Sequence, residues 1–381
     1  MNSLDYFEGS YNEYLIRKAD QERIPMSGTF ELLPACNMRC KMCYIQQDYA
    51  SVLKHGGLKS VDFWYDKFKE AADEGLLYPL ITGGEPLLYP GFFELYERIQ
   101  PLGFHLCLNT NATLLDREKV ERLAKMPPRR INISLYGASE ETYERLCGYR
   151  DGFNKVIEAF ELLNEYNIQF RVHCTLTPDN YDDYQGIIDI CNKYHAPLQM
   201  TTYMFPPFRK EKGLINNEGR FTPEMAAEAS MRYKRDHYAS QTQLYKNSVY
   251  AYVKAFETPQ IYSLYNDNTV ACHAGKATFW VDWHGYVSGC GVHNIHKFNL
   301  EEVSFKEAWK QITAITDQTR LPEKCKTCNY RCVCMICPAA AYTETGSENE
   351  APEYLCRYAK HYAKLVQKEY ERLYQDESNN L

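Results

Sequence analysis

Residues 36–43 read Cys36-Asn37-Met38-Arg39-Cys40-Lys41-Met42-Cys43, so that three cysteines are separated first by three residues and then by two. The stretch directly follows an apolar run, Gly28 to Pro34, which we expect to form a strand. Three thiolates from one short loop can bind three irons of a cubane cluster, and the next cysteine is as far away as Cys107. The loop therefore predicts a four-iron cluster with one open iron, whereas a zinc knuckle would need a fourth ligand.

The composition limits the class of protein. The chain has 381 residues, of which 45% are hydrophobic, so we expect about two or three domains with a buried core. The net charge is −7 and no long basic stretch occurs, so we expect no nucleic-acid partner. No run of about 18 apolar residues occurs, and Met1 to Asp20 lacks a signal-peptide pattern, so we expect a cytoplasmic protein without a membrane partner. Fifteen cysteines in such a chain favour metal ligands over disulfides.

The first half of the chain alternates short β-branched runs with longer helical patterns, which is typical of an α/β fold with a parallel sheet. We expect strands at 28–34, 78–82, 104–109, 131–135, 168–175 and 197–203. We expect helices near 60–74, 91–100, 116–125, 152–166 and 181–194.

Unusual residues follow four consecutive strands of this predicted sheet. After the cysteine loop come Thr82 to Pro86, then Asn109 to Ala112, then Ser134 to Gly137. Ligands of parallel α/β folds bind outside the carboxyl ends of the strands. We expect a ligand site at this edge, where Gly83 and Gly84 would let the main chain approach the ligand.

Taken together, the cysteine loop and Gly83-Gly84-Glu85-Pro86 resemble the signature of the radical S-adenosylmethionine (SAM) enzymes. The resemblance implies a partial (β/α)6 barrel and an open iron that chelates the amino and carboxylate groups of SAM. It also implies an electron from a reductant such as flavodoxin or ferredoxin, which cleaves SAM to a 5′-deoxyadenosyl radical.

The resemblance further implies which residues contact SAM. The backbone of Gly83, Gly84 and Glu85 would meet the amino group, and Ser134 with Arg145 would contact the ribose and carboxylate. For Arg145, an ordinary surface arginine is an equal alternative. Asn109 and Asn111 are further candidates. Met42, followed by Tyr44 after the third cysteine, stands where many relatives have an aromatic residue, and we expect it to contact adenine.

A second group of cysteines lies near the C-terminus. Cys272 and Cys290 flank residues 278–289, which read as a hairpin with His284-Gly285 at the turn. Further cysteines follow at Cys325, Cys328, Cys332, Cys334, Cys337 and Cys356. Taken alone, two Cys-x-x-Cys pairs suit a structural zinc ribbon as well as iron–sulfur clusters.

Seven of these cysteines resemble the SPASM domain, a C-terminal extension of some radical SAM enzymes that holds two auxiliary 4Fe–4S clusters. The resemblance assigns Cys272, Cys290 and Cys337 to the inner cluster (auxiliary cluster I). It assigns the outer cluster (auxiliary cluster II) to Cys325, Cys328, Cys334 and Cys356, with Cys332 as the alternative to Cys334. The protein would then hold three clusters. We interpret the other cysteines, Cys107, Cys147, Cys174 and Cys191, as small buried apolar residues.

Three cysteines for the inner cluster would leave one iron open, to which a substrate cysteine could bind as thiolate. The alternative is that Cys332 or Asp267 completes the shell. Formylglycine-forming relatives carry an acidic residue just after the second SPASM cysteine, where this chain has Gly291-Val292-His293. We therefore do not expect formylglycine formation, although His293 could replace the acidic base.

The predicted organisation has five parts. They are an N-terminal arm at 1–27, a barrel at 28–203, a connector with helices at 204–270, a small cysteine-rich SPASM domain built from a hairpin plus helices at 271–358, and a C-terminal helix and tail at 359–381. The 27-residue arm is too short for a leader-binding domain, which we expect to be separate or absent.

The function implied by the resemblance is hydrogen abstraction from an unactivated carbon, which makes the protein an oxidoreductase. The favoured substrate is a peptide, as in the RiPP maturases that modify ribosomally made peptides by thioether or carbon–carbon crosslinks or by oxidation. One alternative is a dehydrogenase or haem-pathway enzyme acting on a small molecule. The other is an iron–sulfur electron carrier or zinc-binding scaffold, which would have no need of the Gly83–Pro86 turn.

Overall fold

The computed structural model describes residues 11–45, 49–54, 56–206, 219–239, 241–257, 268–293 and 295–378. The strands are β1 (Ser27–Glu31), β2 (Tyr78–Thr82), β3 (Cys107–Thr110), β4 (Arg130–Ser134), β5 (Phe170–Thr175), β6 (Leu198–Thr201), β7 (Thr278–Val281), β8 (Tyr286–Ser288) and β9 (Lys297–Asn299). The helices are α1 (Tyr11–Glu22), α2 (Tyr49–Lys54), α3 (Val61–Asp73), α4 (Phe92–Ile99), α5 (Arg117–Lys125), α6 (Glu140–Thr142), α7 (Gly152–Glu165), α8 (Tyr184–Lys193), α9 (Pro223–His237), α10 (Thr242–Glu257), α12 (Phe305–Gln318), α13 (Pro338–Thr345) and α14 (Glu353–Ser378).

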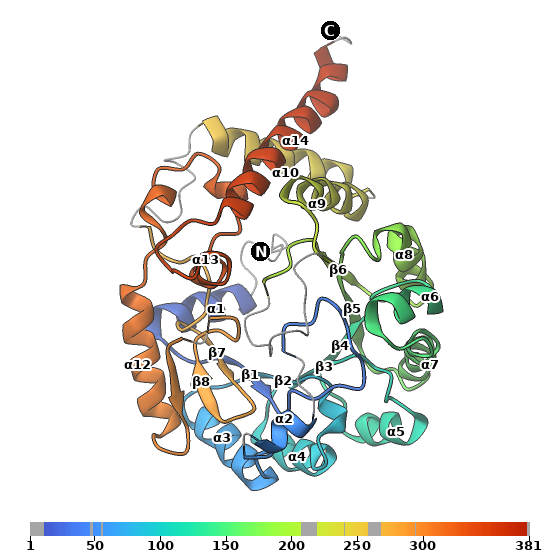
Figure 1. Cartoon of the computed structure of the whole chain (residues 1–381), viewed down its shortest axis with the longest axis vertical. Helices are drawn as coiled ribbons and strands as arrows, with labels where there is room; N and C mark the ends of the chain where they lie inside the picture. Colours follow the sequence, from blue (N-terminus) through green and yellow to red (C-terminus); the bar gives the residue numbers. More distant parts are fainter. Residues whose placement is uncertain are drawn as a thin grey trace.

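The strands form one sheet in the order β6-β5-β4-β3-β2-β1-β7-β8-β9. All pairs from β6 to β7 are parallel, and β8 pairs antiparallel with both β7 and β9. Figure 1 shows the parallel strands curving around the centre of the molecule with helices α3 to α8 on their outer side. The predicted α/β class with a parallel-sheet barrel core and a cysteine-rich C-terminal region is confirmed.

The C-terminal hairpin is part of the same sheet as the barrel. β7 pairs directly with β1, with Ser27 opposite Thr278 and Phe30 opposite Val281. The predicted hairpin turn is confirmed, since Gly285 has φ +87°, a conformation that glycine adopts without steric cost. The cysteines around the hairpin are therefore attached rigidly to the first barrel strand, and the sheet continues across the predicted domain boundary at residue 270.

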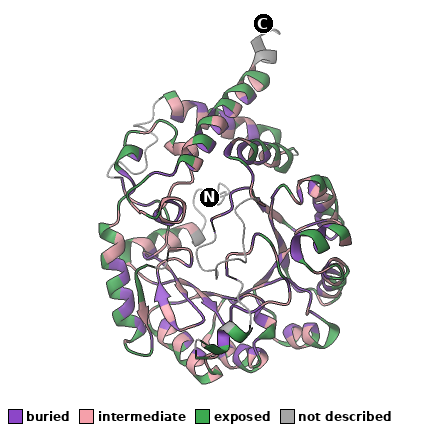
Figure 2. Cartoon of the chain, in the orientation of Figure 1, coloured by how far each residue is buried: buried purple, intermediate pink, exposed green. Residues whose placement is uncertain are grey.

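The core lies between the sheet and its outer helices. Helix α3 begins after Ser60, whose side chain accepts a hydrogen bond from the N–H of Phe63, as expected for an N-cap. Its buried face packs on β1, where the rings of Phe30 and Phe68 stack with centroids 3.8 Å apart. Figure 2 shows buried residues concentrated on the strands and on the inward faces of the helices. Burial of such apolar side chains is the main force that holds the layers together.

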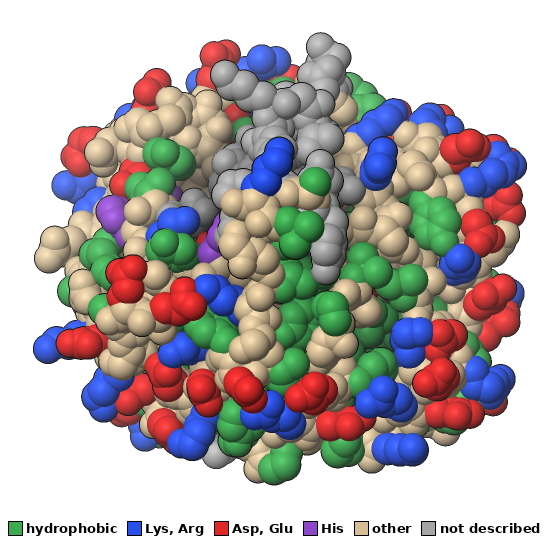
Figure 3. Space-filling model, turned by 60° about the horizontal axis from the view of Figure 1, so that its bottom comes forward, with side chains coloured by type: hydrophobic (Ala, Val, Ile, Leu, Met, Phe, Trp, Pro, Cys, Tyr) green, Lys and Arg blue, Asp and Glu red, His purple; other side chains and the backbone are tan. Residues whose placement is uncertain are grey.

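The C-terminal helix α14 packs on α9 and α10. Its Glu369, which is 4% exposed, accepts hydrogen bonds from Arg235 of α9 and Tyr245 of α10. The helix begins at Glu353, ahead of the predicted boundary at 358, so Cys356 lies in its first turn. Acidic and basic side chains are interspersed around the rim of the face shown in Figure 3. No helix of the described ranges is long and apolar enough to cross a membrane.

Candidate iron–sulfur and cofactor site

The first cysteine loop leaves β1 at the carboxyl edge of the sheet. Burial raises the pKa of the Cys36 thiol to about 12, and negative charge on Glu85, Cys40 and Cys43 acts in the same direction. The three thiols thus lie close enough together for their charges to interact. The N–H of Met38 lies 3.4 Å from the Cys36 sulfur and acts in the opposite direction. A thiol with a pKa this high keeps its proton near neutral pH in the absence of a metal, so metal binding by Cys36 must release that proton.

The loop is fixed by the segment that follows β4. The N–H of Arg39 donates to the carbonyl of Cys147 at 2.8 Å, and the N–H of Lys41 donates to the carbonyl of Leu146 at 2.9 Å. Met42 is only 8% exposed and belongs to the main core, while Tyr44 is half-buried. The loop is therefore held by backbone hydrogen bonds to residues 146–147 and by the burial of Met42 in the core.

The glycine turn after β2 packs directly against the cysteine loop. The N–H of Gly84 donates to Leu33 at 2.8 Å, and the N–H of Glu85 donates to Ala35 at 2.9 Å. A Cβ on Gly84 would lie 2.2 Å from the carbonyl oxygen of Ala35. The absence of a side chain at Gly84 therefore lets the turn pack on the backbone of the cysteine loop, and the contact of Gly83 and Gly84 with SAM stays a prediction.

Glu85 joins the ends of two strands. Its carboxylate is 0% exposed and accepts hydrogen bonds from the Thr110 hydroxyl at 2.9 Å, the Asn111 N–H at 2.8 Å and the Leu87 N–H at 3.1 Å. Burial raises its pKa to about 7, while these hydrogen bonds act to lower it. The carboxylate is occupied by hydrogen bonds within the protein, and the contact of the Glu85 backbone with SAM stays a prediction.

Asn111 reaches the cysteine loop and Asn109 does not. The amide of Asn111 lies 3.5 Å from the Cys36 sulfur and donates to Asn37 at 2.9 Å. Asn109 instead accepts a hydrogen bond from Asn132 at 2.7 Å, within a polar row on the inner face of the sheet. Side chains alternate along a strand, so the sequence places residues 109 and 111 on the same face and cannot tell which of them reaches the cysteine loop. The contacts with Cys36 and Asn37 identify Asn111.

Ser134, Tyr136 and Arg145 lie around the other side of the loop. Tyr136 shares a hydrogen bond with Ser134, and its pKa is raised well above 10 by burial and by the nearby Cys40. The prediction missed Tyr136, although it lies two residues after Ser134. Arg145 is exposed and donates to the carbonyl of Asp179 at 2.7 Å, so it holds a neighbouring loop in place.

The inner cysteines line one small cavity. Cys272 lies before β7, Cys290 follows β8, and Cys337 precedes α13. They line a cavity of about 80 Å³, and burial together with the neighbouring thiols raises the pKa of Cys337 to about 11. Each of the three sulfurs has a backbone N–H at 3.4 Å, from Ala274, Val292 and Ala340.

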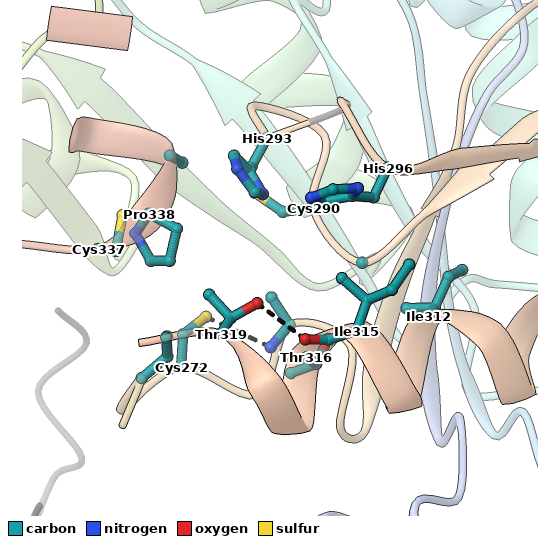
Figure 4. Close-up of a pocket in the computed structure, with 14 residues that line it drawn as sticks. Cys272, Cys290, His293, His296, Ile312, Ile315, Thr316, Thr319, Cys337 and Pro338 are labelled. Atoms are coloured by element: carbon teal, nitrogen blue, oxygen red, sulfur yellow. Dashed lines mark hydrogen bonds between the residues drawn. The ribbon is translucent and has the colours of Figure 1, made fainter. Parts of the chain in front are cut away.

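Two histidines line the same cavity (Figure 4). Nε2 of His293 lies 2.8 Å from Oε1 of Glu348, and its side chain is 15% exposed. Burial lowers the pKa of His293, while the charge of Glu348 acts to raise it. His296 is 43% exposed, and its Nε2 lies 3.8 Å from the other oxygen of Glu348.

The outer cysteines line a larger cavity of about 740 Å³, which has Cys325, Cys328, Cys334 and Cys356 in its wall. Burial raises the pKa of Cys334 to about 12, and the nearby thiols of Cys325, Cys356 and Cys328 act in the same direction. Cys332 is not part of this wall, and its sulfur lies 4.0 Å from the carbonyl of Asn329. The geometry therefore favours Cys334 over Cys332.

These residues fit iron–sulfur clusters. In each set the donors are thiols, and backbone N–H groups approach the sulfurs of Cys36 and of the inner set, as hydrogen bonds to cluster sulfur require. Within the described part of the chain, no three Cys, His, Asp or Glu side chains converge on a point that one ion would occupy. Cys147, Cys174 and Cys191 are buried as expected, whereas Cys107 is half-buried.

Comparison with known proteins places these features in a family context. Residues 30–191 match the model of the Radical SAM superfamily. Over 343 residues the chain is 26% identical to the AdoMet-dependent heme synthase of Methanosarcina barkeri, which covers 86% of this chain and 95% of that protein.

Two solved structures share the fold along nearly the whole chain. One is anSMEcpe with bound AdoMet and Cp18Cys peptide, at 20% identity and TM-score 0.67, covering 93% of this chain and 99% of that chain. The other is Streptococcus suis SuiB bound to the precursor peptide SuiA, at 18% identity and TM-score 0.66, covering 93% of this chain and 83% of that chain. At these identities the likeness concerns the fold.

Proposed function

This chain is a radical SAM enzyme with its radical SAM domain over residues 30–191, and from this premise we propose that it modifies a peptide by abstracting hydrogen from an unactivated carbon. A four-iron cluster held by Cys36, Cys40 and Cys43 would bind and reduce SAM, supplying a 5′-deoxyadenosyl radical for that step. A low-potential protein such as flavodoxin or ferredoxin would supply the electron. The free thiols support a cytoplasmic location.

The observation that carries the proposal is the convergence of four strand ends on the cysteine loop. Gly84 donates to the residues before Cys36, and Asn111 reaches Cys36 itself. Tyr136 approaches Cys40 from the other side. An electron carrier would need the thiols alone, whereas this arrangement surrounds them with backbone and amide groups that can orient a second ligand.

We assign the two auxiliary clusters to the two cysteine sets that line separate cavities. The inner cluster would be bound by Cys272, Cys290 and Cys337, and the outer cluster by Cys325, Cys328, Cys334 and Cys356. Because β7 pairs with β1, Cys272 and Cys290, which flank the hairpin, would lie on an element that is hydrogen-bonded to the strand leading into the SAM cluster loop. Fully loaded protein would then contain about three four-iron clusters.

A peptide substrate is supported by the fold shared with two structures that contain bound peptides, SuiA in SuiB and Cp18Cys in anSMEcpe. A small haem-pathway molecule is the second candidate, because the chain spans 95% of the heme synthase from Methanosarcina barkeri. The two candidates differ in the partner that stimulates SAM cleavage. A peptide encoded beside this gene should do so in the first case, and a tetrapyrrole in the second.

The proposal is tested by anaerobic reconstitution with iron and sulfide, followed by incubation with SAM, reductant and either candidate substrate. Peptide modification predicts 5′-deoxyadenosine release together with a mass change confined to the peptide. The control is the Cys36→Ala, Cys40→Ala, Cys43→Ala triple variant. Turnover of a tetrapyrrole but of none of the neighbouring peptides would overturn the peptide assignment and leave the radical SAM assignment intact.

A further inference from the structure

Three thiols line the inner cavity, whereas a cubane cluster has four irons, each of which needs a ligand. The sequence left three ways to complete the shell: a substrate thiolate, Cys332 or Asp267. Cys332 lies in the outer region, where Cys328 is the neighbouring thiol that affects its pKa. Asp267 lies outside the described residues. The remaining metal-binding groups that line this cavity are the imidazoles of His293 and His296 (Figure 4).

His293 has the position of a ligand in both sequence and space. It follows Cys290 with two residues between them, in the loop that leads from β8 to β9. This is the same separation that lets the Cys-x-x-Cys pairs of metal sites bind one centre. Its side chain is 15% exposed, and in Figure 4 its ring lies beside Cys290 on the cavity wall.

Glu348 determines which ring nitrogen of His293 is available to bind a metal. Nε2 lies 2.8 Å from Oε1 of Glu348, an ion-pair distance, although the two atoms are not aligned as in a hydrogen bond. A carboxylate oxygen this close favours the tautomer with the ring proton on Nε2, in which Nδ1 keeps its lone pair. A histidine that gives one N–H to a carboxylate and binds a metal through its other nitrogen is the usual arrangement at metal sites. Glu348 lies between α13 and α14 and therefore joins the loop of Cys290 to the element that carries Cys337.

We propose that Nδ1 of His293 is the fourth protein ligand of the inner cluster and that Glu348 orients it. This assignment rests on the inner-cluster part of the proposed function. It closes the shell of that cluster, so a substrate cysteine would find no open iron there. A neutral imidazole in place of a thiolate also raises the reduction potential of an iron–sulfur cluster.

The experiment starts from the full-length Cys36→Ala, Cys40→Ala, Cys43→Ala variant, which would retain the two auxiliary clusters. After anaerobic reconstitution and reduction, pulsed electron paramagnetic resonance measures nitrogen coupling to the cluster spin. We expect the coupling of a directly bound imidazole. Adding His293→Ala should abolish it, and adding His296→Ala, the matched control, should leave it unchanged.

A second variant guards against simple misfolding. His293→Cys should retain the irons of both auxiliary clusters, lose the nitrogen coupling and lower the reduction potential of the inner cluster. Two results would overturn the ligand assignment: no imidazole coupling in a parent that contains both clusters, or a coupling that survives in His293→Ala. An unchanged potential in His293→Cys would do the same.

The iron content shows whether only the assignment of His293 as a ligand is wrong or whether the inner cluster itself is absent. If Cys272→Ala, Cys290→Ala and Cys337→Ala together remove no iron, there is no inner cluster, and the inner-cluster part of the proposed function falls together with the assignment of His293. If they remove about four irons and the imidazole coupling is absent, only the assignment of His293 falls.

Discussion

The buried carboxylate of Glu85 accepts a hydrogen bond from the hydroxyl of Thr110 at 2.9 Å, which joins the ends of β2 and β3 beside the cysteine loop. The same carboxylate accepts the N–H groups of Asn111 and Leu87. Glu85 is thus a structural link between strand ends that surround the first cysteine.

Replacing Glu85 should destabilise the protein. Glu85→Ala leaves the buried donors of Thr110 and Asn111 without their acceptor, which typically costs about 1–3 kcal/mol per unsatisfied group. Glu85→Gln keeps one acceptor oxygen and should lose less. Thermal unfolding of the cluster-free protein measures both variants. Equal stability of Glu85→Ala and the wild type would contradict the linking role.

The pKa of Glu85 predicts a pH dependence with a definite sign. Burial raises this pKa from 4.5 to about 7. Between these values the folded state holds a proton that the unfolded chain has released, so stability falls as the pH rises, by up to about 3 kcal/mol in total. Below 4.5 both states are protonated and the loss is absent. The wild type should therefore lose more stability over this range than Glu85→Gln; parallel pH profiles of the two would refute it.

Gly84 should tolerate no side chain. A Cβ would lie 2.2 Å from the carbonyl oxygen of Ala35, and only movement of the loop that carries Cys36 would relieve the clash. Since displacement of a reacting group by about 1 Å can cost roughly a hundredfold in rate, Gly84→Ala should reduce SAM cleavage by about that factor. Gly219→Ala is the control, because a Cβ on Gly219 would meet nothing within 4 Å. Equal loss in both variants would argue against a local effect.

Replacing Cys334 and replacing Cys332 should have different effects on the iron content. Cys334→Ala removes a thiol from the wall of the outer cavity and should lower the iron content by about one four-iron cluster. Cys332→Ala should leave the iron content and the spectra of the outer cluster unchanged. The opposite pattern would show that Cys332 is the ligand and that this loop rearranges when iron binds.

The fold could be predicted because hydrophobic alternation, helix caps and glycine turns are local signals. The strand at 78–82 has the predicted bounds, and the helix predicted near 116–125 is α5, whose N-cap Asp116 accepts a hydrogen bond from the N–H of Lys119. The first strand ends earlier than predicted, at Glu31, although Leu32 and Leu33 still form hydrogen bonds with Thr82 and Gly84 at the end of the neighbouring strand. Pairing of β7 with β1 is a contact between segments about 250 residues apart in the sequence, which no local pattern specifies.

The candidate site was predictable where spacing alone carries the signal. The cysteine loop and the two C-terminal cysteine sets come from spacing and family resemblance. The choice between Cys332 and Cys334 could not be made in this way, because both lie at acceptable spacings and only the turn at 331–333 orients their thiols. The pairing of His293 with Glu348 depends on how α13 packs near the hairpin, which the sequence does not reveal.

The central claim is that Cys36, Cys40 and Cys43 bind the cluster that cleaves SAM. The most direct test measures 5′-deoxyadenosine released by anaerobically reconstituted wild type and by the triple alanine variant, with iron counted in both. We predict release by the wild type, no release by the variant and a difference of about four irons. Release of 5′-deoxyadenosine by the triple variant at the wild-type rate would contradict the account.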